Sequence, residues 1–188
     1  FATQNQNKVM ELQQLMPSNI ELLSLKDINC DDDIPEKADT LDGNATQKST
    51  YVVNKFKVNC FADDTGLEVE ALSNEPGVLS ARYAGEQKDS NDNMDLVLEK
   101  LKSKSNRKAK FRTVISLIIN GNENLFEGEA KGEIIDEKCG VEGFGYDPIF
   151  KPEGYDMTFA EMSIAEKNKI SHRGKAVRKL IDFLNKND

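Results

Sequence analysis

A hairpin pattern in the middle of the chain constrains the fold more than any other local feature. Residues 111–119 and 125–135 are rich in strand-forming residues, and Asn120-Gly121-Asn122 between them is a strong signal for a tight β-turn. Further strand and helix patterns alternate around this hairpin, with strands expected at 20–25 and 58–61 and helices at 44–55 and 171–185. This interleaving predicts an α/β fold with a mixed sheet.

The N-terminal segment continues the same pattern. Phe1-Ala2-Thr3 reads as the end of a strand. Asn5 or Asn7 can cap a helix in which Val9 and Leu12 follow helical spacing. At 188 residues, the chain is predicted to form one domain, residues 1–188, rather than two small ones.

Composition excludes several classes of function. The 25 Lys and Arg against 33 Asp and Glu give a net charge of 25 − 33 = −8, so DNA, RNA and anionic membranes are poor electrostatic partners. The longest mostly apolar run, residues 114–119, is far too short to cross a bilayer. Cys30, Cys60 and Cys139 form no CxxC pair, which argues against zinc or disulfide scaffolds and predicts reduced thiols in the cytoplasm.

Several familiar catalytic patterns are absent from the sequence. There is no GxxxxGK[ST] loop, no GxGxxG and no GxSxG. The single histidine, His172, rules out HExxH zinc chemistry and leaves a weak case for a histidine-activated nucleophile.

Asp63-Asp64-Thr65-Gly66 is the strongest local signal for chemistry. It follows an apolar strand, and we expect the strand to end there in a glycine turn. Mg²⁺ is commonly held by one or two carboxylates together with substrate phosphates. Neighbouring residues on a strand point to opposite faces, so one carboxylate at most faces a given pocket directly. An ordinary polar turn explains the four residues about equally well.

Two further segments could bind phosphate. Thr3, Asn5 and Lys8 lie at a predicted helix start, where backbone amides, a hydroxyl and an ammonium group suit an anion. Lys48 lies on the helix that follows an acidic loop, residues 26–43. A plain capped helix and a solvated lysine are the simpler interpretations of these two segments taken alone.

Two more segments could bind a nucleobase. Phe144-Gly145-Tyr146-Asp147-Pro148 offers aromatic faces for stacking and a carboxylate to accept from a ring N–H. Ser171-His172-Arg173 offers donors to an exocyclic oxygen, although a helix start explains it equally simply. Together the segments supply a metal carboxylate, phosphate donors, a stacking ring and base-edge donors, which describes a nucleoside triphosphate site.

The chain resembles the inosine triphosphate pyrophosphatases, which hydrolyse non-standard purine nucleoside triphosphates. The matching segments follow the family's order from residue 3 to residue 173 and are Thr3-x-Asn5-x-x-Lys8, Asn44-Ala45-x-x-Lys48, Ala62-Asp63-Asp64-Thr65-Gly66-Leu67, Pro76-Gly77-x-x-Ser80-Ala81-Arg82-Tyr83-x-Gly85, Phe144-Gly145-Tyr146-Asp147-Pro148 and Glu166-Lys167-x-x-x-Ser171-His172-Arg173. Six ordered matches are far more specific than any one of them.

The resemblance implies a long mixed sheet flanked by helices, two lobes with a central substrate cleft, a homodimer and a requirement for Mg²⁺. It implies that Asp64 is the catalytic carboxylate and, with Glu36, a metal ligand, and that Asp63 and Lys48 assist catalysis. The remaining roles it implies are phosphate binding by Thr3, Asn5, Lys8, Lys48 and Thr65, base binding by Phe144, Gly145, Tyr146, Asp147, Lys167, His172 and Arg173, and a place near the cleft for Ser80 and Arg82.

Departures from the family pattern are confined to the phosphate side. Gln4 and Asn7 stand where the family often has glycine, and Gly43 stands where an acidic residue is usual. The implied reaction splits ITP, dITP or XTP into a monophosphate and pyrophosphate. A pyrophosphatase for modified pyrimidine nucleotides and a non-catalytic nucleotide-binding module are the alternatives.

Overall fold

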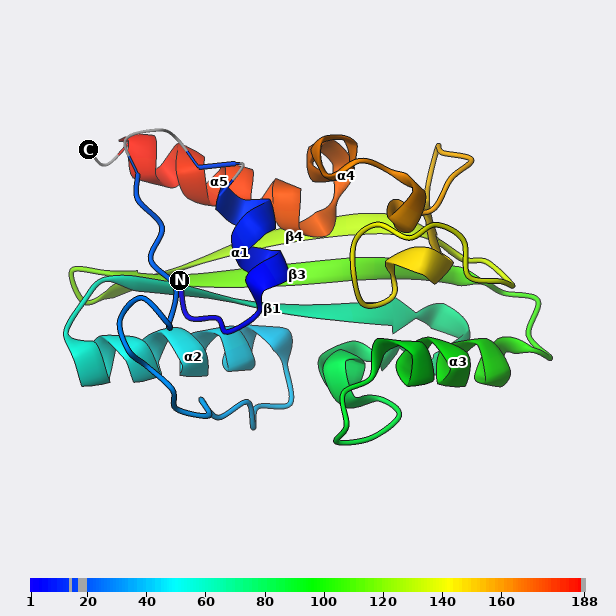
Figure 1. The fold of residues 1–188 in the computed structure, drawn as a ribbon, viewed down its shortest axis with the longest axis horizontal. Coiled ribbons are helices and arrows are strands. Elements are labelled where there is room, and N and C mark those ends of the chain that lie inside the picture. Colours follow the sequence, from blue (N-terminus) through cyan, green and yellow to red (C-terminus); the bar gives the residue numbers. More distant parts are fainter. Residues whose placement is uncertain (14, 17–19, 187–188) are drawn as a thin grey trace. The chain divides into compact units, whose positions relative to one another are not determined.

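The computed structural model describes residues 1–13, 15–16 and 20–186, and it places five strands in one sheet (Figure 1). The strand order is β2-β1-β3-β4-β5. The strands are β1 (Cys60–Val69), β2 (Glu75–Pro76), β3 (Lys108–Ile119), β4 (Asn122–Ile134) and β5 (Phe150–Pro152). Edge strand β2 pairs antiparallel with β1, and β5 pairs antiparallel with β4.

The predicted hairpin is present between β3 and β4. Asn120 and Gly121 have φ angles of 50° and 79°. Positive φ at both central residues is the signature of a turn whose twist matches that of its flanking strands, and Asn-Gly adopts it at low cost.

Helices begin where the sequence supplies capping side chains. Thr40 accepts a hydrogen bond from the Gly43 amide and starts the second helix, and Asp89 accepts from the Asn91 amide and starts the third. The helices are α1 (Gln6–Gln13), α2 (Leu41–Phe56), α3 (Ser90–Leu101), α4 (Ile164–Ile170) and α5 (His172–Lys186), with 3-10 turns η1 (Glu70–Leu72), η2 (Gly77–Arg82), η3 (Asp147–Ile149) and η4 (Phe159–Glu161). No helix in the described part of the chain is long and apolar enough to cross a membrane.

The chain divides into two compact units, each built from separate stretches of sequence. Unit 1 comprises residues 1–64, 113–128 and 173–188, and unit 2 comprises residues 65–112 and 129–172. Strands β1, β3 and β4 each contribute residues to both units. The expectation of a single domain over 1–188 stays a prediction.

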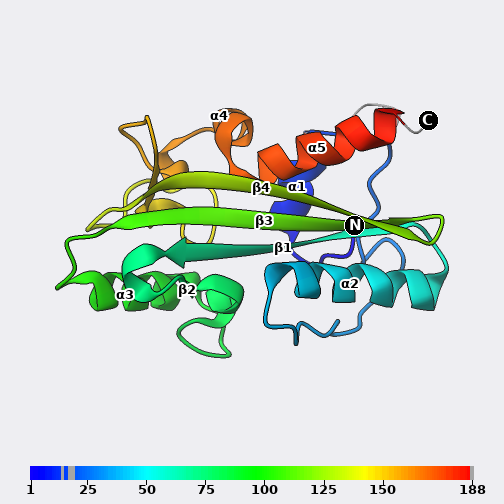
Figure 2. The same ribbon diagram turned by 180° about the vertical axis from the view of Figure 1, so that it is seen from behind.

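Unit 1 has apolar packing on both faces of its part of the sheet. Leu12 of α1 and Leu180 of α5 belong to one buried cluster with Ile115 of β3. Val52 of α2 belongs to another cluster with Ala62 of β1. Helices α1 and α5 therefore cover one face of these strands and α2 covers the other (Figures 1 and 2).

Unit 2 has one large buried cluster with an aromatic centre. Phe111 of β3 lies 4.7 Å from Phe150 and 6.0 Å from Phe159 between ring centroids. Val97 of α3 and Leu67 of β1 are completely buried in the same cluster. Tyr146 and Ile149 belong to the same cluster, so this core supports the 140–149 segment, which carries four of the candidate residues.

Three expectations about strands need correction. Residues 20–25 form no strand, and residues 1–3 form none either, although the Ala2 amide donates to the Phe61 carbonyl at 2.8 Å. The strand predicted to end at Asp63-Asp64 continues as β1 to Val69. Gly66 permits this, because a Cβ there would lie 2.6 Å from the Gly77 carbonyl oxygen of the neighbouring segment.

Candidate functional site

Asp63 lies inside β1 and is held by two cations on one face of the sheet. Its carboxylate accepts from Lys8 Nζ of α1 at 2.8 Å and from Arg173 Nε of α5 at 3.2 Å. Asp63 is 1% exposed and Arg173 is 2% exposed. A carboxylate so deeply buried needs paired charges of this kind to remain ionised.

Asp64, the next residue, contacts a different helix. Its two oxygens accept from Asn44 Nδ2 and Lys48 Nζ of α2, each at 3.2 Å. Lys48 Nζ also donates to Glu36 of the acidic loop, so one buried ammonium group bridges both predicted metal ligands. Asp63 and Asp64 therefore take their partners from opposite faces of the strand, as alternation along β1 requires.

The two neighbouring carboxylates have pKa values pushed in opposite directions. Burial acts to raise the pKa of Asp63, but the charges of Lys8 and Arg173 outweigh it and hold the pKa far below its ordinary value. Burial raises the pKa of Asp64 despite the nearby charge of Lys48. Opposed shifts in adjacent groups are typical of acid–base sites.

The lysines of this cluster also differ. Burial lowers the pKa of Lys8, with Asp63 opposing that effect. Burial also acts to lower the pKa of Lys48, but Asp64 and Glu36 outweigh it and raise the pKa. Lys48 is therefore held as a permanent cation between two carboxylates.

The N-terminal loop positions Lys8. Thr3 Oγ1 accepts from the Asn5 amide at 3.1 Å, and Asn5 Oδ1 accepts from the Asn7 amide at 3.0 Å, so Asn5 caps α1 as predicted. Gln4, which departs from the family pattern, donates through Nε2 to the Asp32 carbonyl at 3.2 Å and ties this loop to the acidic loop.

The acidic loop that carries Glu36 is anchored to α2. Asp32 accepts from the Tyr51 hydroxyl at 2.7 Å and pairs with Lys55. The Lys37 amide donates to Gln47 Oε1 at 3.0 Å, and the Ala38 amide donates to Asn44 Oδ1 at 2.9 Å. Asn44 thus contacts both this loop and Asp64. No role was predicted for it, although it lies in the Asn44-Ala45-x-x-Lys48 motif.

In unit 2, the predicted base residues surround Asp147. Its carboxylate accepts from the Phe144 amide at 2.8 Å and from Lys167 Nζ at 2.7 Å. The side chains of Lys167 and Asp147 are each 3% exposed, and Lys167 Nζ lies 4.9 Å from the centroid of the Phe144 ring. Gly143, with φ at 75°, leaves room for this carboxylate, because a Cβ there would lie 2.2 Å from Asp147 Oδ2.

The other candidates fall into different settings. His172 packs its ring against Phe111 at 4.5 Å in the aromatic core of unit 2, and Tyr146 donates its hydroxyl to the Ser80 carbonyl at 2.8 Å. Arg173 belongs to unit 1, where it contacts Asp63, although it was predicted among the base residues. Arg82 forms no ion pair with any residue that the structure describes.

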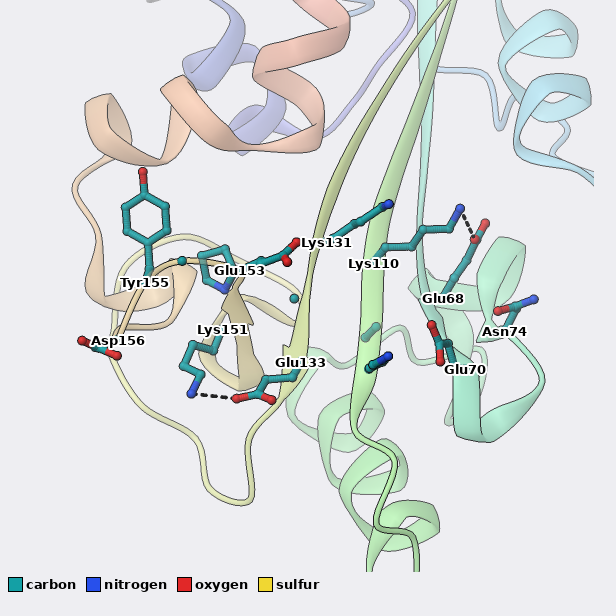
Figure 3. Close-up of a pocket in the computed structure, with 15 residues that line it drawn as sticks. Glu68, Glu70, Asn74, Lys110, Lys131, Glu133, Lys151, Glu153, Tyr155 and Asp156 are labelled. Atoms are coloured by element: carbon teal, nitrogen blue, oxygen red, sulfur yellow. Dashed lines mark ion pairs between the residues drawn. The ribbon is translucent and has the colours of Figure 1, made fainter.

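A pocket of about 880 Å³ opens elsewhere in unit 2 (Figure 3). Its lining contains none of the predicted site residues. Lys110 pairs there with Glu68 at 3.4 Å and Lys151 with Glu133 at 2.7 Å. Five acidic and four basic side chains line it, which does not suit a triphosphate.

The two predicted metal ligands, Glu36 and Asp64, both pair with Lys48. No group of three or more acidic, histidine or cysteine side chains arranged for a metal occurs among residues 1–13, 15–16 and 20–186. Glu36 and Asp64 nevertheless share one cation, and two carboxylates suffice for Mg²⁺ when substrate phosphates and waters complete its shell.

Comparison with known proteins decides the family. The Ham1 family profile matches residues 1–183. The chain belongs to the Ham1 family. It is 59% identical to a dITP/XTP pyrophosphatase of Flavobacterium psychrophilum, over 97% of this chain and 96% of that protein. It is 42% identical to a dITP/XTP pyrophosphatase of Bacillus subtilis, over 98% of this chain and 95% of that protein.

Solved structures of Ham1 proteins have the same fold. The Staphylococcus aureus Ham1 protein superimposes with a TM-score of 0.90 at 38% identity, covering 100% of this chain and 97% of that chain. A Ham1 protein from Coxiella burnetii gives a TM-score of 0.90 at 36% identity, covering 98% of this chain and 96% of that chain. The predicted α/β class with a sheet flanked by helices is confirmed, although the five strands form an antiparallel sheet and not the expected mixed one. The predicted family of nucleoside triphosphate pyrophosphatases is also confirmed.

Proposed function

We propose that this Ham1-family chain hydrolyses non-standard purine nucleoside triphosphates, ITP, dITP and XTP, to the monophosphate and pyrophosphate with Mg²⁺ as cofactor. One observation carries the proposal: the adjacent carboxylates Asp63 and Asp64 lie in one cluster of buried cations, with Asp63 paired to Lys8 and Arg173 and Asp64 paired to Lys48. The names of the relatives, dITP/XTP pyrophosphatase, support the same substrate class.

Asp64 is the general base of the proposed reaction. Asp64 is 9% exposed and Asp63 is 1% exposed with its charge held by Lys8 and Arg173, so Asp64 is the carboxylate more open to an attacking water. Asp64 takes the proton of the attacking water, and Asn44 fixes the orientation of the carboxylate. Asp63 acts by holding Lys8 in place rather than by accepting a proton.

Lys8 and Lys48 bind the phosphates in this scheme, assisted by Thr3, Asn5 and Thr65. The ammonium groups stabilise the charge that develops on the pyrophosphate leaving group. Glu36 and Asp64 would hold the Mg²⁺, which when bound neutralises phosphate charge and polarises the phosphorus.

Selection of the base is assigned to the loop around Asp147. Phe144 and Gly145 provide the stacking surface, and Tyr146, Asp147, Lys167 and His172 build or line the base site. The Lys167 ammonium donates to a 6-oxo group, which hypoxanthine and xanthine carry and adenine lacks. ATP, whose 6-amino group cannot accept, gains no hydrogen bond from this ammonium group.

The remaining expectations belong to the same proposal. The chain acts as one catalytic domain over residues 1–188, as a homodimer in the cytoplasm, with Ser80 and Arg82 near the substrate. Its partner is a small nucleotide rather than nucleic acid or a membrane.

A pyrophosphate-release panel tests the proposal. Purified protein is given ITP, dITP, XTP, GTP, ATP and a pyrimidine triphosphate with Mg²⁺, and each assay is repeated with EDTA. We expect rapid release from ITP, dITP and XTP that EDTA abolishes. Faster release from the pyrimidine nucleotide, or tight binding of ITP without release of pyrophosphate, would overturn the proposal.

A further inference from the structure

Ser80 is a junction of three buried hydrogen bonds within unit 2. Its Oγ accepts from the Leu67 amide of β1 at 2.9 Å and donates to the Gly77 carbonyl at 2.6 Å. Its carbonyl accepts from the Tyr146 hydroxyl at 2.8 Å. Ser80 is 9% exposed and Tyr146 is 5% exposed, so these bonds are largely shielded from water.

These bonds connect two candidate segments. On one side, Leu67 follows Thr65 by two residues on β1. On the other side, Tyr146 precedes Asp147, which binds Lys167 and the Phe144 amide. The path from Thr65 to the base loop therefore runs through one side-chain hydroxyl and one carbonyl of Ser80.

The β1 end of this path has little freedom to move. A Cβ at Gly66 would lie 2.6 Å from the Gly77 oxygen and 2.9 Å from its carbonyl carbon, so the two backbones are in direct contact. Gly77 has φ at 53°, a conformation that glycine adopts readily. The 77–82 turn is thus fixed on β1 by backbone contact and by the Ser80 hydroxyl.

The base-loop end depends on Tyr146. Its hydroxyl donates to a buried carbonyl, and burial raises the pKa of that hydroxyl, which keeps the proton in place at neutral pH. Because the hydroxyl is committed to Ser80, the ring of Tyr146 supports the loop and does not present its polar end to a ligand.

We propose that Tyr146 and Ser80 are positioning residues that hold the Phe144–Lys167 base site in register with the Thr65 segment of β1. This inference rests on the proposed function and deepens it, because it makes purine selectivity depend on a hydroxyl that contacts no substrate. Without the bond, the loop samples positions in which Lys167 no longer donates to a 6-oxo group. The value of kcat/KM therefore falls more for ITP than for ATP.

The test compares Tyr146→Phe with wild type through the ratio of kcat/KM for ITP to that for ATP. Loss of one buried hydrogen bond predicts a ratio lowered about fivefold to tenfold, through a higher KM for ITP. Partial unfolding lowers both rates by the same factor, so the ratio does not respond to a merely structural defect. Tyr155→Phe is the matched control, since Tyr155 is 44% exposed in the same unit.

A second variant keeps the inference falsifiable. Ser80→Ala removes the hydroxyl at the other end of the path and should lower the same ratio, and the double variant should be no worse than the poorer single one. If the wild-type protein releases pyrophosphate from ITP but Tyr146→Phe leaves the ratio unchanged, the inference is overturned and the proposed function stands. A wild-type protein that releases no pyrophosphate from ITP overturns the proposed function and this inference with it.

Discussion

The charged cluster of unit 1 and the base loop of unit 2 are built in different ways. In unit 1, Asp63 and Asp64 draw partners from three helices, Lys48 also pairs with Glu36 of the acidic loop, and most of these contacts join opposite charges. In unit 2, Asp147 of the base loop pairs with Lys167 of α4 and accepts from the Phe144 amide, and the neutral bond from Tyr146 to Ser80 fastens the same loop. The charged cluster of unit 1 therefore suits proton transfer and charge stabilisation, whereas the base loop of unit 2 suits selection of a base by its shape.

This contrast has an energetic consequence. Buried charges that neutralise one another depend on every member, because removing one leaves another uncompensated. Each neutral hydrogen bond contributes less to the free energy of unfolding, and its loss mainly changes how well the site matches its ligand. Substitutions of the unit 1 charges should therefore affect rate and stability most strongly, and loss of the neutral bond from Tyr146 to Ser80 in unit 2 should affect mainly selectivity.

The largest effect is expected at Asp64. Asp64→Asn removes the proposed proton acceptor but keeps the size of the side chain, so kcat for ITP should fall about 10²-fold to 10⁴-fold. Steady-state pyrophosphate release measures it. Asp31→Asn, in the exposed part of the acidic loop, is the control and should leave kcat unchanged. Full activity in Asp64→Asn would contradict the role of Asp64 as proton acceptor.

Breaking the other carboxylate's ion pair should mainly affect stability. Arg173→Met removes one of the cations that pair with Asp63, which is 1% exposed, and the free energy of unfolding should fall by about 3–5 kcal/mol. Urea denaturation measures the loss. Arg178→Met, exposed on the same helix, is the control. A loss in Arg173→Met no greater than in Arg178→Met would contradict the view that Asp63 needs both cations.

Substitution in the base loop should change selectivity. Lys167→Met removes the ammonium proposed to meet the 6-oxo group, so kcat/KM for ITP should fall about tenfold to a hundredfold while that for ATP changes less. The comparison uses both substrates on one preparation, so a fraction of unfolded protein does not alter the ratio. Lys169→Met, exposed on the same short helix α4, serves as control. Equal losses for the two nucleotides would argue against base recognition by Lys167.

Local chemistry made much of the fold predictable from sequence. Asn120-Gly121 specifies its turn through backbone preference alone, and helical spacing marks α2 and α5, although α2 begins at Leu41 after the Thr40 cap and not at the expected residue 44. The strand expected at residues 20–25 was wrong because contacts from elsewhere in the chain hold this segment: the Leu23 carbonyl accepts from the Phe1 amino group at 2.7 Å, and Phe1 lies in no strand. The predicted turn at Asp63-Asp64 was wrong for a related reason: the cations that make buried carboxylates tolerable come from distant segments.

The candidate site was predictable as a set of residues but not as a set of contacts. Ordered motifs mark Asp63, Asp64 and Lys48 in the sequence, whereas Asn44 stands in a motif without an assigned role. The pairing of Arg173 with Asp63, 110 residues apart, and the bond from Tyr146 to Ser80, 66 residues apart, depend on tertiary packing. No local pattern encodes such pairings.

The smallest expected effect lies at the start of α4 in unit 2 and serves as a baseline for the stability comparison. Glu166 and Ser163 form a capping box, and hydrogen bonds from Ser163 hold the pKa of Glu166 below its ordinary value. A lowered folded-state pKa means that this carboxylate stabilises the protein above its unfolded pKa and loses that contribution as pH falls. Wild type should therefore be slightly more stable than Glu166→Gln at about pH 7, and the difference should shrink between about pH 5 and pH 3.

Thermal unfolding over that pH range measures the difference. Glu137→Gln, at another exposed glutamate of unit 2, should show no comparable loss of stability relative to wild type at neutral pH. A Glu166→Gln difference that grows as pH falls would reverse the sign expected for the capping carboxylate. An effect as large as that of Arg173→Met would instead mean that exposed and buried charges contribute alike, which would remove the contrast between the charged cluster of unit 1 and the hydrogen-bonded segments of unit 2.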